Sequence, residues 1–270
     1  MENGGTAFKR IKLYRCGCCV NRTSAILKNA KRESVSFPAL VVLLQHKVHG
    51  NILFDTGYTP RIYKNGMISV IYNLLNKACV KEEDTIRYRL KQDGIKRVDR
   101  IILSHAHPDH IGGLKDFEDY ELITTKEVLD TMESPRVREL VFKNQIPSFQ
   151  EEGIHVTTLF PMRKPHFLMD YFGELYDILG DKSIIGVKLK GHSRGQLGIY
   201  INEQKLFFAA DSSWGESFAG RIGDMRVIAK YIQNNFDAYQ ETVNAIKRLK
   251  RDYPEIRVIY SHEPFTEETL

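Results

Sequence analysis

The residues best suited to chemistry in this chain form one short run, Ser-His-Ala-His-Pro-Asp-His at positions 104–110. Three imidazoles and one carboxylate, from His105, His107, Asp109 and His110, fall within six positions. Neutral imidazole suits zinc, and a carboxylate adds negative charge for a second ion. Of the nine histidines in the chain, five lie in this run or directly after two later strand-like segments. The run therefore indicates a metal site rather than a surface loop with chance histidines.

Two metal ions need more ligands than this run supplies. Three further candidates each follow a strand-like segment: His192, Asp211 and His262. An aspartate can offer one oxygen to each of two ions, which suits Asp211 as a bridge. The expected arrangement places three histidines on one ion (His105, His107, His192), Asp109 and two histidines on the other (His110, His262), and Asp211 between them.

A pair of ions at such a site predicts hydrolysis. Two ions about 3.5–4 Å apart share a water whose pKa falls towards about 7, so hydroxide is present at neutral pH. That hydroxide attacks a carbonyl or phosphorus centre while one ion polarises the substrate oxygen. Asp109 is expected to act as a ligand and also to pass a proton to the leaving group. The chemistry requires no Ser/His/Asp or Cys/His triad.

The segments that must position these residues alternate between strand-like and helix-like patterns. Strands are expected at residues 8–14, 39–45, 51–55, 98–103, 121–125, 154–160, 184–189, 197–201, 206–210 and 256–260. Helices are expected at residues 67–79 and 82–92, from residue 111 onward, and over most of 224–251. His49-Gly50 is a turn signal that predicts a hairpin between the second and third strands. The pattern fits an α/β (α+β) fold, a four-layer αββα sandwich of two mixed sheets flanked by helices.

Composition bounds the class of protein. Hydrophobic residues make up 42% and charged residues 27% of the 270 positions, which is ordinary for a globular protein. No repeat or linker interrupts the chain, so a single domain over residues 1–270 is expected. No apolar run approaches the roughly 18 residues of a membrane span, and the polar N-terminus lacks a secretory signal. A cytoplasmic protein is the expectation, with no membrane partner.

The charge balance argues against a nucleic-acid partner. A net charge of +5 is a mild bias, and nucleic-acid binders usually carry a clustered basic face. The densest basic run, Lys247 to Arg251, precedes Tyr253-Pro254 at the expected end of a helix, where cations suit the helix dipole. The four cysteines, Cys16, Cys18, Cys19 and Cys79, lack the paired spacing of a zinc finger and are expected to be free thiols. Whether the first three lie near the site stays open.

The run SHAHPDHIGG at 104–113 resembles the H-x-H-x-D-H motif of the metallo-β-lactamase superfamily. The family's other landmarks follow in order: FDTG at 54–57, GHSRGQ at 191–196, AAD at 209–211 and SH at 261–262. The resemblance spans residues 39–262 and implies the αββα fold, the seven ligands above and two Zn²⁺ ions, although Mn²⁺ or Fe²⁺ would also fit them. It further implies that Asp55 lies behind the metals and orients ligand histidines, and that Gly57, Gly112 and Gly113 permit tight turns.

Within that superfamily the chain resembles the quorum-quenching N-acyl-homoserine lactonases, through ILFDTGY, HPDHIGGL, GHSRGQLG and SHEP. The resemblance implies a hydrolase that opens a lactone. Those lactonases carry a tyrosine three residues after the bridging aspartate, where it assists the substrate carbonyl, whereas this chain has Trp214. Indole offers an N–H donor without an acidic phenol, and Trp214 is expected to line the pocket with a catalytic role.

Other functions remain open on the same fold. The rivals are a thioesterase of the hydroxyacylglutathione type, a phosphodiesterase or RNA-processing nuclease, and an effector without turnover. A complete ligand set argues against the effector. Two apolar stretches, residues 63–75 and 167–176, predict either a lid over an apolar pocket or ordinary core and dimer contacts. A lid would mean a small-molecule substrate with an apolar portion, and a homodimer is also possible.

Overall fold

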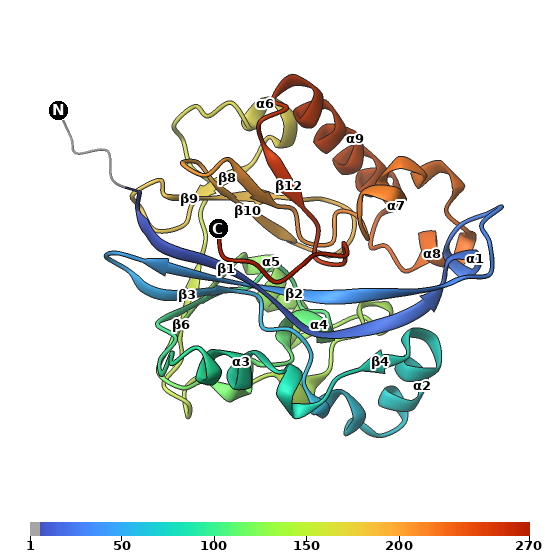
Figure 1. Cartoon of the computed structure of the whole chain (residues 1–270), viewed down its shortest axis with the longest axis horizontal. Helices are drawn as coiled ribbons and strands as arrows, with labels where there is room; N and C mark the ends of the chain where they lie inside the picture. The colour runs from blue at the N-terminus through green and yellow to red at the C-terminus, as the bar shows by residue number, and fades with distance from the viewer. Residues whose placement is uncertain (1–5) are drawn as a thin grey trace.

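The computed structural model describes residues 6–270. Within these residues twelve strands form two β-sheets, and nine α-helices lie around them (Figure 1). No helix in this described part is both long and apolar enough to cross a membrane.

The larger sheet has seven strands in the order β4-β1-β2-β3-β5-β6-β7. The strands are β1 (Phe8–Arg22), β2 (Ser34–His46), β3 (Gly50–Phe54), β4 (Ala78–Cys79), β5 (Arg100–Ile102), β6 (Glu121–Thr124) and β7 (His155–Thr158). β2 and β3 form the predicted antiparallel hairpin, and β5, β6 and β7 continue from β3 in parallel. The parallel part matters because the carboxyl ends of β3 and β5 meet at one edge of the sheet.

The smaller sheet has five strands in the order β12-β11-β10-β9-β8. They are β8 (Leu175–Asp177), β9 (Ile184–Lys188), β10 (Leu197–Ile201), β11 (Leu206–Phe208) and β12 (Arg257–Ile259). β8 to β11 pair antiparallel, and β12 joins β11 in parallel. Each sheet is therefore mixed, as the sequence predicts.

Alternation along the strands produces the layers. In β2, Leu40, Val42 and Leu44 face the smaller sheet, while Val41 and Leu43 face the outer helices. Because successive strand side chains point to opposite faces, a strand that is apolar throughout must be covered on both sides. Three apolar clusters result, one between the sheets and one between each sheet and its helices. The αββα sandwich expected from the sequence is confirmed.

The helices cover the outer faces of both sheets (Figure 1). They are α1 (Thr23–Ile26), α2 (Gly66–Asn76), α3 (Ile86–Gln92), α4 (Pro108–Ile111), α5 (Lys126–Glu133), α6 (Met169–Phe172), α7 (Glu216–Gly220), α8 (Val227–Tyr231) and α9 (Phe236–Asp252). The Asn235 side chain caps α9 by accepting from the Ala238 N–H at 3.1 Å. The basic run 247–251 closes α9, which ends at Asp252, as predicted.

Some segments differ in extent from the sequence expectation. The helix predicted from residue 111 onward instead begins at Pro108 and ends at Ile111, so it contains Asp109 and His110. Proline favours the first helical position, where its missing N–H costs nothing, and this signal explains the earlier start. The first strand continues past residue 14 to Arg22 and contains Cys16, Cys18 and Cys19.

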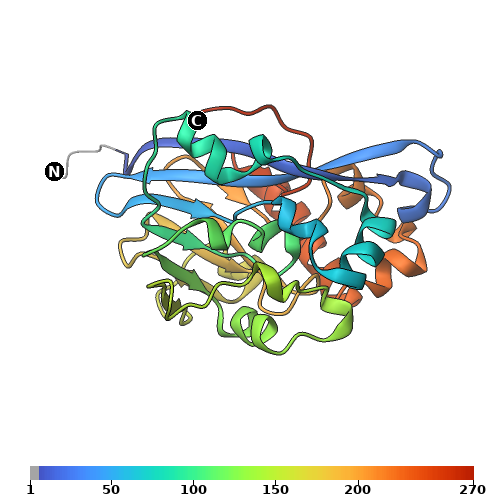
Figure 2. The same ribbon diagram turned by 90° about the horizontal axis from the view of Figure 1, so that it is seen from below.

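The long ends of β1 and β2 extend past the rest of their sheet, with α2 and α8 near that end (Figures 1 and 2). Both helices expose apolar side chains there, including Met67 and Leu74 on α2 and Ile228 on α8. The predicted helix at 67–79 therefore forms over 66–76, but most of its apolar face is open to solvent rather than packed. An exposed apolar cluster of this kind usually marks a binding surface.

Candidate metal centre

Five of the seven metal-ligand candidates lie in loops that follow a strand, and the other two lie on the short helix that comes next. His105 and His107 follow β5, and α4 then carries Asp109 and His110. From the other sheet, His192 follows β9, Asp211 follows β11 and His262 follows β12. The structure brings all seven side chains together where the two sheets present their strand ends, a place rigid enough to fix side-chain geometry.

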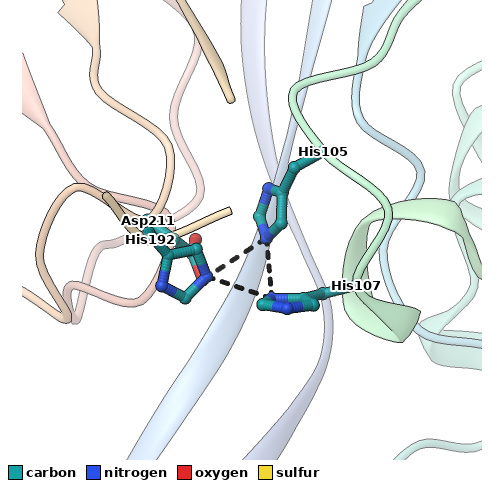
Figure 3. A group of neighbouring side chains, drawn as sticks. All are labelled: His105, His107, His192 and Asp211. Carbon is teal, nitrogen blue, oxygen red and sulfur yellow. Dashed lines mark hydrogen bonds and ion pairs between the residues drawn. The ribbon is translucent and has the colours of Figure 1, made fainter. Parts of the chain in front are cut away.

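The seven side chains form two groups that share one residue. The first contains His105, His107, His192 and Asp211, and the second contains Asp109, His110, Asp211 and His262. Figure 3 shows the first group, with His105 and His107 on one side and His192 and Asp211 on the other. Within each group the ligand atoms all lie within 4.8 Å of one another. Asp211 is the only described residue common to both, as expected of a bridge.

Distances in the first group suit a single small cation. His107 Nδ1 lies 2.9 Å from His105 Nε2 and 3.0 Å from His192 Nε2. Asp211 Oδ2 lies 3.4 Å from His192 Nε2 and 3.9 Å from His105 Nε2. Around tetrahedral zinc, with metal–nitrogen bonds of about 2.0–2.1 Å, donor atoms are separated by about 3.3 Å. The donor set therefore has the right spread for zinc.

The second group has the same spacing. His262 Nε2 lies 2.9 Å from Asp211 Oδ2 and 3.3 Å from Asp109 Oδ2. His110 Nε2 lies 3.3 Å from Asp211 Oδ1 and 3.6 Å from Asp109 Oδ2. Asp211 therefore faces the second group with both oxygens, Oδ1 towards His110 and Oδ2 towards His262, and Oδ2 also lies 3.4 Å from His192 Nε2 of the first group, so the carboxylate contacts both groups.

Hydrogen bonds behind the rings fix which nitrogen faces inward. His192 Nδ1 lies 2.8 Å from Gln233 Oε1, and Gln233 Nε2 donates to the Ala229 carbonyl at 3.1 Å, which orients the amide. His262 Nδ1 lies 2.8 Å from the Pro38 carbonyl oxygen. An oxygen that can only accept requires an N–H on Nδ1, so Nε2 of both rings presents a lone pair to the centre.

Asp55 and Ser104 impose the same tautomer on two more rings. The Ser104 hydroxyl donates to Asp55 Oδ2 at 2.7 Å and can then accept from His105 Nδ1 at 3.0 Å. His110 Nδ1 donates to the same carboxylate at 2.7 Å. The Ser104 backbone N–H donates to Asp55 Oδ1 at 2.8 Å. Asp55 lies fully buried behind the rings, the position that the family resemblance implies for it.

In the first group the Nε2 lone pairs of His105 and His192 converge on the same place, and a cation there would accept both. His110 Nε2 and Asp211 Oδ1 are buried and have no hydrogen-bond partner within residues 6–270. A buried polar atom left unpaired costs about 1–3 kcal/mol. Both orphaned atoms point into the second group, and a divalent ion there would satisfy them. The residues present therefore fit the metal centre that the sequence predicts.

Burial and charge divide the histidines into two classes. Burial holds the pKa of His105, His107 and His192 below the ordinary value, so these rings are neutral and able to ligate. Burial also opposes charge on His262, but Asp211 outweighs it and raises the pKa to about 9. The same competition, won by Asp211 with Asp55 and Asp109, raises the pKa of His110. The second group is thus the more negative environment.

Strained backbone brings two carboxylates into place. Asp55 has φ of 62° and Ala210, directly before Asp211, has φ of 45°. Left-handed backbone costs a non-glycine residue about 1–2 kcal/mol and persists only where surroundings enforce it. Backbone hydrogen bonds enforce this conformation at both residues. The Asp55 N–H donates to the Ile102 carbonyl at 3.0 Å, and the Ser261 N–H donates to the Ala210 carbonyl at 3.1 Å.

A cavity of about 280 Å³ opens onto both groups. His107, Asp109, His192, Asp211 and His262 line one side of it. The rest is mainly apolar and aromatic, formed by Phe37, Tyr58, Tyr72, Leu75, Trp214 and Ile228. A more open depression of about 440 Å³, lined by Arg97, Asp99 and His155 among others, contains none of the clustered residues. The smaller cavity is therefore the candidate substrate site.

The residues that line this cavity can be compared with those that the sequence suggested. Trp214 lines it, packed edge-on against Phe37 at 6.4 Å between ring centroids, as predicted. Cys19 also lines it and is a free thiol. Of the two apolar stretches, residues 63–75 contribute Tyr72 and Leu75 to its wall. Residues 167–176 instead pack into the core, so they form no lid.

Sequence reasoning missed the groups that orient the rings. Ser104 stands next to the histidine run, and its position alone was a usable signal. Gln233 lies 41 residues from His192, and no local pattern marks it. The Pro38 carbonyl lies 224 residues from His262 and carries no side-chain signal. Such contacts depend on how the strands assemble rather than on local sequence.

Comparison with known proteins agrees with this geometry. The family model described as "Metallo-beta-lactamase superfamily" matches residues 36–262, most of the chain. A "Probable metallo-hydrolase" of Mycobacterium bovis is 24% identical over 241 residues, covering 83% of this chain and 74% of the relative.

Two solved structures share the fold. One is an N-acyl homoserine lactone hydrolase with the product N-hexanoyl-L-homoserine bound at its catalytic metal centre. It has a TM-score of 0.72 and 17% identity, and covers 96% of this chain and 94% of its own. The other is AidC, a dizinc quorum-quenching lactonase, with a TM-score of 0.63, 16% identity and coverage of 96% and 92%. At these identities the likeness concerns the fold alone.

Proposed function

The chain belongs to the metallo-beta-lactamase superfamily, and from this premise we propose that it is a di-zinc hydrolase that opens a lactone or a related small ester. The observation that carries the proposal is the pair of four-residue groups sharing Asp211. The first group gathers neutral histidines, and the second surrounds two histidines with carboxylates, both at spacings suited to zinc. The fold is that of solved lactonases, which supports a lactone over other carboxylic esters.

The proposed ligands are those predicted from the sequence. His105, His107 and His192 hold one ion, Asp109, His110 and His262 hold the other, and Asp211 joins them. When bound, the ions supply Lewis acidity towards the substrate carbonyl and lower the pKa of water so that it attacks at neutral pH. Imidazole and carboxylate favour Zn²⁺, although Mn²⁺ and Fe²⁺ accept the same ligands.

The chain's own residues orient the substrate and move the proton. Trp214 lines the cavity, and its indole N–H has no acceptor within residues 6–270, so it is free to donate to the substrate carbonyl oxygen. Asp109 also faces the cavity and is placed to pass a proton to the leaving alkoxide. The apolar walls exclude water and accommodate a hydrocarbon portion of the substrate.

Replacing Trp214 with phenylalanine tests the donor role. Phenylalanine keeps an aromatic wall against Phe37 but removes the N–H. We expect kcat to fall about tenfold or more while KM stays within about twofold, because the lost hydrogen bond strengthens as charge develops on the carbonyl oxygen. Tyr231→Phe, which removes a hydroxyl from an exposed aromatic outside the cavity, is the control. Unchanged kcat in Trp214→Phe would mean that the indole takes no part.

Three substrate classes separate this proposal from its rivals. Purified protein loaded with Zn²⁺ should open N-hexanoyl-homoserine lactone and acidify an unbuffered solution. A thioesterase would instead release free thiol from an acylglutathione. A phosphodiesterase would cleave a bis-aryl phosphate. Activity confined to either of the last two would overturn the lactone proposal, and no activity on any, with metal bound, would favour the effector without turnover.

A further inference from the structure

One side chain in the cavity has no role in the proposed reaction. Arg138 lines the same cavity as the metal-binding groups, among mostly apolar neighbours such as Leu140 and Ile232. Within residues 6–270 it is the only lysine or arginine that does so. A guanidinium is always charged and carries five N–H donors in a fixed planar fork. Its partners therefore decide whether that charge is available to a ligand.

Arg138 has no acidic partner. No carboxylate oxygen of the described chain lies within 4.0 Å of its nitrogens, since no salt bridge of Arg138 occurs. One terminal nitrogen of the guanidinium donates hydrogen bonds to the Asn234 carbonyl at 3.1 Å and to Asn234 Oδ1 at 3.3 Å. The adjacent carboxylate, Glu139, is engaged elsewhere: Arg194 Nε donates to it at 2.6 Å and the Arg136 backbone N–H at 2.6 Å. The charge of Arg138 is thus left uncompensated.

The segment Gln233–Asn234 makes hydrogen bonds both to Arg138 and to His192, one of the candidate metal ligands. The Asn234 backbone N–H donates to the His192 carbonyl at 3.0 Å, and the neighbouring Gln233 accepts from His192 Nδ1 at 2.8 Å. Asn234 in turn accepts from Arg138. These hydrogen bonds therefore hold the Arg138 guanidinium in a defined position relative to His192 and the candidate metal centre.

We propose that Arg138 binds a carboxylate of the substrate, distant from the carbonyl that is attacked. The substrate class is then an ester or lactone whose apolar portion carries an anionic group, an inference that rests on the proposed hydrolase function. The guanidinium fork matches a carboxylate with two parallel hydrogen bonds. One cation balances the single charge of a carboxylate better than the roughly −1.5 to −2 charge of a phosphate monoester.

Matched esters test the proposal. p-Nitrophenyl hexanoate and the mono-p-nitrophenyl ester of adipic acid share a six-carbon chain and differ in the terminal carboxylate, and octanoate and suberate extend the comparison by two carbons. In the wild type we expect kcat/KM to favour a carboxylate ester over its neutral partner by about tenfold or more. Arg138→Gln should abolish that preference, and Arg138→Lys should keep part of it because the charge remains.

Arg136→Gln is the control. It removes the same charge two positions away, from an exposed side chain outside the cavity, and should leave the preference unchanged. A merely structural role of Arg138, acting through Asn234 on His192, would lower the rates of both esters equally. Equal losses in Arg138→Gln, or no preference in the wild type at either chain length, would overturn the proposal.

A binding measurement tests the role of Arg138 independently of the proposed hydrolase activity. If none of the esters is hydrolysed, the ester hydrolase fails, and calorimetric titration of the Zn²⁺-loaded protein with adipate and with hexanoate still decides the role of Arg138. About tenfold tighter binding of adipate, lost in Arg138→Gln and kept in Arg136→Gln, would support it. Equal affinities for the two acids would refute it.

Discussion

Replacing Asp211 with alanine is expected to lower kcat/KM by about three orders of magnitude or more and to reduce bound metal below two ions per chain. Asp211 is the residue that both four-membered groups share. Its loss removes one donor from each group and leaves His110 Nε2 and His262 Nε2 without their shortest carboxylate contacts. Elemental analysis and turnover of a lactone, measured on the same preparation, check both effects.

The control for this change is Asp237→Ala, which removes an exposed carboxylate in the first turn of α9. It should leave metal content and rate near those of the wild type. Circular dichroism of Asp211→Ala should show that the fold remains, since the three apolar clusters do not depend on this side chain. Two tightly bound ions and undiminished turnover in Asp211→Ala would rule out a bridging role.

Gly191→Ala is expected to destabilise the protein by about 3 kcal/mol or more, lowering Tm by roughly 6 °C or more. Gly191 has φ of 110°, a conformation that residues with a Cβ rarely adopt. A Cβ built there would lie 2.0 Å from the Tyr239 backbone nitrogen and 2.3 Å from its Cα. Because these are backbone atoms in the first turn of α9, no side chain can rotate to make room.

The same change should also weaken the metal centre. Gly191 precedes His192, and its carbonyl accepts from the Asn235 backbone N–H at 2.8 Å, so a displaced turn moves the imidazole. Thermal unfolding followed by circular dichroism measures the stability effect. Gly220→Ala adds the same methyl at the end of α7, with positive φ absent and nothing within 4 Å of the new Cβ. A Tm loss no larger in Gly191→Ala than in Gly220→Ala would contradict the packing described.

Much of the fold could be predicted because its signals are local. A strand such as β2 is apolar at every position from Pro38 to Leu44, and only a strand covered on both faces requires that pattern. The histidine run is equally local, since four ligand types within six residues restrict the chemistry before any contact is known. The positions after β9, β11 and β12 followed from the tendency of sites to occupy strand ends.

What the sequence did not provide depends on long-range contacts. Gln233 and Arg138 acquire their roles only when the segment at 233–235 packs beside His192. The helix α2 is another case: its apolar residues predict a packed face, yet Met67 is 75% exposed and Leu75 60% exposed at the cavity wall. Periodicity reports that a face is apolar and does not report which partner, core or ligand, will cover it.

These features join in one picture of the site. Two sheets present strand ends to each other, and buried oxygens behind the rings turn their lone pairs inward. The apolar cavity then adds a donor, Trp214, and an uncompensated cation, Arg138. In the proposed mechanism the metal centre would carry out the reaction, Trp214 would stabilise the developing charge on the carbonyl oxygen, and Arg138 would select substrates with a carboxylate.

Titration of metal-free protein with Zn²⁺ tests the central claim most directly. The protein is stripped with a strong chelator, and bound zinc and lactone turnover are followed as equivalents are added. We predict no turnover without metal, saturation at two ions per chain, and activity that appears as those two positions fill. Full turnover in protein shown by elemental analysis to be free of metal would contradict the account.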